Sequence, residues 1–143
     1  MATEILVNDG GAPARILPYT AGVALTAGQA VMASTTVAYE VVLADTGVGL
    51  SVLGYALTNT AAGDNASIIT GKGVILNVQA LPGTAGAALC IGGAAAGQLA
   101  AATNDTVVAV NNRFAPCAMI LKLLQEDGTG TIASAGLWRV QTL

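Results

Sequence analysis

The sequence predicts an all-β fold of a single domain with at most one short helix. Short runs rich in Val, Ile, Leu and Thr recur along the chain, and Gly, Asn, Asp or Pro stands between them. The length of 143 residues fits one compact domain. Many short strands joined by turns are therefore expected.

Nine candidate strands follow in order along the chain. They cover residues 29–33, 37–44, 51–58, 66–70, 73–79, 87–91, 106–110, 118–124 and 136–142. The last strand places Trp138 and Val140 on one face, because successive side chains of a strand alternate. Its other face carries Leu137, Arg139 and Gln141 and is polar enough to meet water.

Two segments have helical composition. Residues 117–127 contain good helix formers after Pro116, so a short helix is the alternative to the strand that we expect there. Residues 94–103 are mostly Ala, and so short a segment makes a marginal helix without tertiary support. We expect a turn or one short helix at 94–103.

The N-terminal segment, residues 1–20, differs from the rest and is expected to form an extended arm, followed by a β-rich domain over 21–143. Two apolar segments, 5–7 and 15–20, flank a stretch with Gly10, Gly11 and Pro13. An extended arm can pair with an exposed sheet edge of a partner. The alternative is a first edge strand that folds onto its own domain.

The predicted core is thin. The apolar fraction is 54%, but Ala supplies much of it, Gly is also abundant, and aromatic side chains make up only 3% of the chain. Buried apolar area contributes roughly 25 cal/mol per Å², so small side chains stabilise a fold less. Oligomerisation or docking would add burial.

No residue pattern supports catalysis, a cofactor or a metal. His is absent, which excludes Ser–His and Cys–His nucleophiles. The acids are scattered, and adjacent Glu126 and Asp127 would point to opposite faces of a strand. The Gly71–Gly73 segment lacks the spacing of a phosphate-binding loop. We expect a protein that is not an enzyme.

Charge and targeting signals also restrict the partners. A net charge of −3 with scattered cations gives no field for nucleic acid. Residues 73–104 are uncharged, but their Ala and Gly composition argues against a membrane span. The N-terminus lacks a secretory signal, so synthesis in the cytoplasm is expected. Cys90 and Cys117 are expected as buried free thiols, with a single disulfide as the alternative.

A weak internal repeat is visible between the two halves of the chain. "TAGQAVM" at 26–32 matches "TAGAALC" at 84–90, and "GYAL" at 54–57 matches "PCAM" at 116–119. A repeated unit suits two similar halves of one sandwich or barrel, although chance matches are common in an Ala- and Gly-rich chain.

Four segments from about residue 26 onward form a recognisable series: "LTAGQAVMAS", "VLGYALTNTAAGDNASIITGKGVI", a second "GTAGAALCIGG" and the closing "GLWRVQTL". In this series the chain resembles small bacteriophage capsid decoration (cement) proteins. The resemblance implies a β-sandwich or tulip-like barrel that trimerises on the outer surface of an icosahedral head. The partners implied are the other copies of the homotrimer and the major capsid protein, whose subunit contacts it would stabilise.

The resemblance also makes the N-terminal segment the candidate capsid contact. The candidate residues are Ile5, Leu6, Val7, Arg15, Ile16, Leu17 and Tyr19. Deletion of residues 1–18 is then expected to weaken capsid binding and to leave a folded trimer. The alternative function is a surface binding module, such as a head-fibre or a receptor- or glycan-binding domain, because exposed aromatic rings stack on sugars.

Overall fold

The computed structural model describes residues 5–6, 12–44, 52–80, 88–91, 96–101, 118–122 and 136–142. This part of the chain is all-β and contains no helix, as the sequence predicts. The strands are β1 (Arg15–Ala21), β2 (Ala30–Ala33), β3 (Glu40–Leu43), β4 (Gly54–Ala56), β5 (Asn65–Thr70), β6 (Ile75–Ala80), β7 (Ala88–Ile91), β8 (Leu99–Ala101), β9 (Ala118–Lys122) and β10 (Gly136–Thr142).

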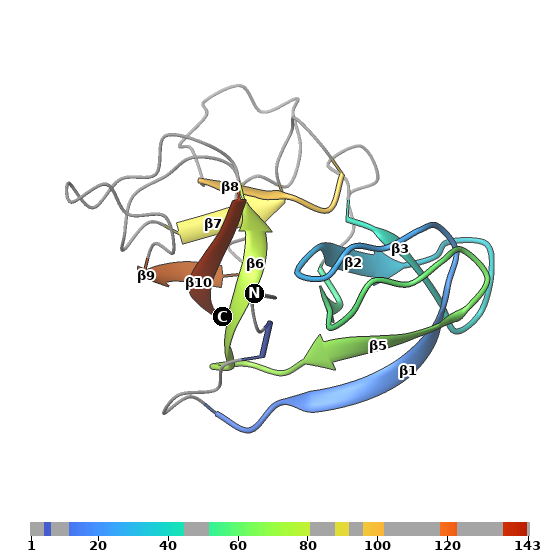
Figure 1. The fold of residues 1–143 in the computed structure, drawn as a ribbon, viewed down its shortest axis with the longest axis horizontal. Helices are drawn as coiled ribbons and strands as arrows, with labels where there is room; N and C mark the ends of the chain where they lie inside the picture. Colours follow the sequence, from blue (N-terminus) through green and yellow to red (C-terminus); the bar gives the residue numbers. More distant parts are fainter. Residues whose placement is uncertain are drawn as a thin grey trace.

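The strands form two small closed barrels that lie side by side (Figure 1). The first has the order β1-β3-β2-β4-β5, and β5 pairs back with β1. Its β1–β3 pair is parallel and its other pairs are antiparallel. The second has the order β10-β6-β8-β7-β9, with a parallel β6–β8 pair at Ala80 and Leu99.

The second barrel repeats the first strand by strand. Replacing β1 to β5 by β6 to β10 reproduces every pairing and its direction. Val31 pairs with Leu43, and Leu89 pairs with Ala101, so Val31 corresponds to Leu89 and Leu43 to Ala101. The match of 26–32 with 84–90 is therefore confirmed for β2 and β7.

The register corrects the second match. Ala30 pairs with Tyr55 and Ala88 pairs with Met119, so Gly54 corresponds to Ala118 and not to Pro116. Following the pairs around each barrel aligns Ile69 with Gln141 and Ile16 with Ile75. β1 thereby aligns, as "RILPYTA" at 15–21, with "VILNVQA" at 74–80, which contains β6.

Two apolar clusters form the core. One fills the first barrel and contains Val31, Val41 and Ile68. The other joins Leu76, Val78 and Val140 of the second barrel to side chains from the outer face of the first. These side chains from the first barrel are Ala30, Met32, Ala44, Tyr55 and Ile69. The second cluster is therefore shared between the two barrels.

Glycines allow the barrels to approach closely. Gly28 has φ 86°, and a Cβ there would lie 2.6 Å from Leu137 Cδ2. Its amide donates to Ala56 O at 2.8 Å, and its carbonyl accepts from Gln79 N at 2.8 Å. The turn before β2 is thus held between the two barrels, where only a residue without a side chain fits.

Eight predicted strands coincide with observed ones. The two elements that differ from the prediction are strand β8 and the N-terminal arm. The segment 118–124, for which a helix was the alternative, contains strand β9. The prediction of a turn or helix at 94–103 is wrong for 99–101, which pair with β7 as strand β8. The candidate strand at 106–110 lies outside the described residues.

The predicted arm also differs from the structure. Residues 15–21 form β1, which pairs with β5 from Arg15 to Thr20 and belongs to the first barrel. Leu6 forms an antiparallel bridge with Leu76, and Ile5 O accepts a 2.7 Å hydrogen bond from Asn77 N. The described part of the N-terminal segment folds onto its own domain, as the alternative prediction holds.

Candidate interaction surfaces

The apolar N-terminal residues predicted to contact a capsid lie partly in the core. Ile5 is 5% exposed and belongs to the shared cluster, and Leu6 packs against it. Val7 lies outside the described residues. A contact through the Ile5 side chain would require this segment to leave β6.

Strand β1 divides the remaining candidates between its two faces. Arg15, Leu17 and Tyr19 alternate with Ile16 along the strand, and Tyr19 packs against the core of the first barrel. Arg15 and Ile16 are exposed, with Ile16 at 47%, whereas Leu17 and Tyr19 are half-buried. Of the predicted contact residues that are described, only Arg15 and Ile16 are exposed.

One edge of β1 is open over part of its length. Ala21 N donates to Asp64 O, and Thr20 N donates to Tyr39 O, so even-numbered residues direct their backbone polar groups away from β5. Within the described residues, β3 pairs with β1 only at Thr20 and Ala21. Pro18 lies on this open edge, where its missing N–H breaks no hydrogen bond of the sheet.

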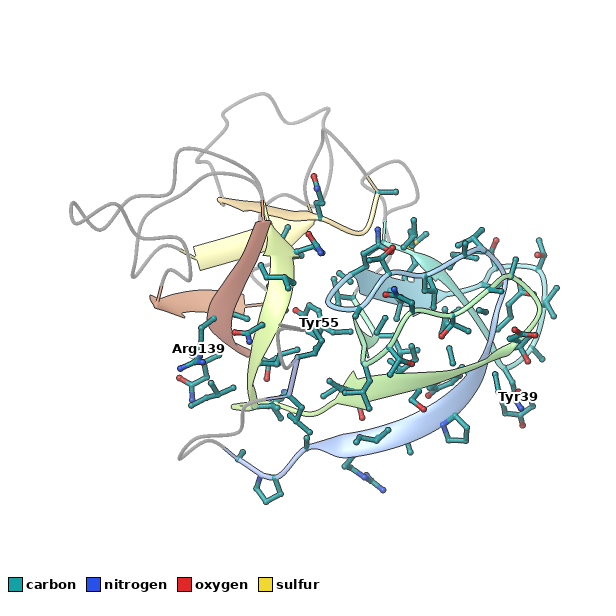
Figure 2. All side chains as sticks on the ribbon, in the orientation of Figure 1. Tyr39, Tyr55 and Arg139 are labelled. Atoms are coloured by element: carbon teal, nitrogen blue, oxygen red, sulfur yellow. The ribbon has the colours of Figure 1, made fainter. Side chains whose placement is uncertain are left out.

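The β2–β3 turn, residues 34–39, is a second exposed feature, and no sequence pattern singles it out. Val37 is 50% exposed and Tyr39 is 85% exposed. Tyr39 has φ 58°, which side chains other than Gly rarely adopt. Figure 2 shows Tyr39 at the end of the first barrel that points away from the second.

Among the described residues, the other aromatic side chains offer less surface. Tyr55 is 3% exposed and belongs to the shared core, so it is unavailable for stacking on a sugar. Phe114 and the side chain of Trp138 lie outside the described parts. Only the exposure and backbone angle of Tyr39 distinguish it, and neither can be read from the sequence.

A small pocket lies where the barrels meet. It is lined by Gly54, Tyr55, Ile69, Thr70 and Thr142 among others, and its volume is about 60 Å³. Ligand sites usually exceed about 300 Å³, so this pocket is too small for a ligand of ordinary size.

Charged groups do not gather into a reactive site in the described part of the chain. No three acidic or cysteine side chains there lie as metal ligands would. Arg139 lies on β10 on the side of the molecule opposite Tyr39 (Figure 2). Its Nε is buried and has no hydrogen-bond partner among the described residues. No helix in these residues is long and apolar enough to span a membrane.

Comparison with known proteins identifies a shared fold. The chain is similar to the N base of head fiber gp8.5 in bacteriophage phi29, with a TM-score of 0.62. The similarity covers 92% of this chain and 95% of that chain at 13% sequence identity. No protein-family model and no curated protein sequence matches the chain. At this identity, the likeness establishes the fold.

Proposed function

We propose that this chain is a non-enzymatic structural protein of a bacteriophage head and binds the outer surface of the capsid. The observation that carries the proposal is the fold, which matches the N base of a phage head fiber over almost the entire length of both chains. The decoration-protein motifs of the sequence support the same location independently. A fold alone does not define a function, so the proposal is tested on particles.

We further propose that the protein acts as a homotrimer whose partner is the major capsid protein. A trimer that binds several capsid subunits at once gains avidity, so weak contacts suffice for stable attachment. The Ala- and Gly-rich composition supports such an arrangement, because each small side chain contributes little burial within the monomer.

Two roles are compatible with this location. The sequence motifs favour a decoration protein that stabilises contacts between capsid subunits, and the fold likeness favours the base of a head fibre. Heating heads with and without bound protein separates these roles. A decoration protein is expected to raise the temperature at which heads open, whereas a fibre base leaves that temperature unchanged.

The central experiment is binding to heads of the phage that encodes this chain, assembled without it. Co-sedimentation should show saturable binding, and a cryo-electron map should show trimers on the outer surface. Light scattering should give the mass of three chains for the free protein. A stable monomer that does not bind these heads would contradict the proposal.

The structure changes the test of the N-terminal segment. Deletion of residues 1–18 would remove Ile5 from the core and most of β1 from the first barrel, so it should unfold the protein. A substitution of exposed residues avoids this problem. The double variant Arg15→Ser and Ile16→Ser keeps the fold and should weaken head binding if β1 meets the capsid.

A further inference from the structure

The β2–β3 turn has a counterpart in the second barrel. Residues 34–39 join β2 to β3, and residues 92–98 join the corresponding strands β7 and β8. The strand register aligns positions 92–97 with 34–39. The first turn reads "STTVAY" and the second reads "GGAAAG". Tyr39 corresponds to Gly97, and both have positive φ, at 58° and 82°. The two barrels thus share the backbone conformation at this position while the side chain differs.

In the second barrel, the end of this turn is a docking element. Gly97 O accepts a 2.8 Å hydrogen bond from Ala30 N, and Gly97 N donates to Ala44 O at 2.9 Å. A Cβ at Gly97 would lie 2.9 Å from Leu43 Cδ2. The second barrel therefore uses this turn, without a side chain, to bind the first barrel.

In the first barrel, the corresponding turn presents its side chains to solvent. Residues 35–39 are all exposed, and none of residues 34–39 is charged. Tyr39 holds a left-handed backbone that Gly would adopt with less strain, yet its ring is 85% exposed and buries little area. The fold therefore gains little from a tyrosine ring here, and a strained exposed residue is typical of a functional contact.

We propose that Tyr39, with Val37 beside it, is the anchor by which the first barrel docks into an apolar pocket on a protein partner. The inference rests on the proposed function, and it names the major capsid protein as that partner. A protein is favoured over a glycan because the turn supplies an apolar neighbour and no acid or amide to bind sugar hydroxyls. The acid next to the turn is Glu40, and its carboxylate lies against Gly22 instead of extending the turn's surface.

The comparison of Tyr39 with Gly97 also excludes one kind of self-association. In it, the β2–β3 turn of one copy would bind the first barrel of another copy in the way that Gly97 does. A Cβ at Gly97 would lie only 2.9 Å from Leu43 Cδ2, so this contact leaves no room for a tyrosine ring. The partner must offer a pocket deep enough for the ring, and a hydrogen-bond acceptor for its hydroxyl would complete the contact. Tyr is among the residues enriched at such binding centres.

The test is head binding by Tyr39→Gly, which installs the residue of the second barrel. Because Gly relieves the backbone strain, the melting temperature should stay the same or rise, while affinity for heads should fall at least tenfold. Tyr39→Phe keeps the ring and should retain most of the affinity. The control is Val23→Ser, which removes a different exposed apolar side chain, outside both the turn and β1, and should leave binding unchanged.

Each outcome decides between defined alternatives. If the unchanged protein binds heads and Tyr39→Gly binds equally well, the anchor is wrong and the proposed function stands. If the unchanged protein does not bind heads, both are wrong. A glycan array on which the unchanged protein binds and Tyr39→Gly does not would reassign the turn to sugars. Loss of trimer mass in Tyr39→Gly would reassign it to self-association.

Discussion

Thr142 shows how one residue fastens the two barrels together. Its hydroxyl donates to Gly71 O at 2.9 Å and accepts from Val74 N at 3.0 Å. Its backbone makes two more bonds, from Gly73 N and to Val74 O. Residues 71–74 are the connection between β5 and β6, so the last strand of the second barrel clamps the link to the first.

Substitution Thr142→Val should destabilise the protein by about 1–3 kcal/mol. Valine has a similar shape, but it leaves the Val74 N–H buried without its acceptor. Urea unfolding measures the change. The matched control is Thr70→Val at the corresponding position, where the hydroxyl makes one 3.2 Å bond to Arg15 O. Equal losses in the free energy of unfolding for the two variants would show that Thr142 has no special role in joining the barrels.

Strands β1 and β6 are corresponding elements with different edges. On β6, Asn77 N donates to Ile5 O and Gln79 N donates to Gly28 O, so the N-terminal segment and the Gly28 turn cover the edge. Pro18 occupies the position of Asn77 on β1 and removes that donor. Proline on an open edge discourages pairing with other chains.

Substitution Pro18→Asn should therefore increase self-association through β1. It supplies the N–H that the corresponding position of β6 uses, and it should change the free energy of unfolding by no more than about 1 kcal/mol. Sedimentation velocity at increasing protein concentration measures the effect. Adding Ile16→Lys should reverse it, because a charge on an edge strand opposes pairing. An unchanged mass distribution would show that the proline does not protect this edge.

The molecule as a whole has two barrels and one apolar cluster that both of them line. The first barrel's own cluster does not include Ala30, Met32, Tyr55 or Ile69, which pack with the second barrel instead. Neither barrel buries these side chains alone. The barrels are therefore expected to depend on each other for stability.

Unfolding should be one cooperative transition in which both barrels are lost together. The calorimetric and van't Hoff enthalpies should agree. Gly28→Ala should lower stability by about 1–3 kcal/mol, since the new Cβ overlaps Leu137. Hydrogen exchange should then accelerate equally in β5 and β6. Two transitions, or faster exchange in one barrel only, would contradict a shared core.

Local composition predicted most of the strands but not their partners. β5, β6 and β10 contain β-branched residues between turn residues, and this pattern was sufficient. β8 reads "LAA", which favours a helix locally, and pairing with β7 overrides that preference. β1 was predicted only as the alternative to an extended arm, and its Pro18 is compatible with an edge strand.

The candidate contact residues were only partly predictable. Ile5 and Ile16 look alike in sequence, yet one is buried between the barrels and the other is 47% exposed. Tyr39 stands in a turn without a recognisable motif, and its exposure follows from where the first barrel ends. Exposure depends on neighbours distant in sequence, so local patterns do not contain it.

Residue type and local spacing were enough to establish the all-β class, the absence of histidine chemistry and the repeat of β2 in β7. Tertiary structure alone decided that the repeat forms two closed barrels, that Ile5 belongs to their shared core, and that Tyr39 is exposed where Gly97 docks against the first barrel. Strand pairing and burial join residues far apart in the chain, and their energy is defined only when those residues meet.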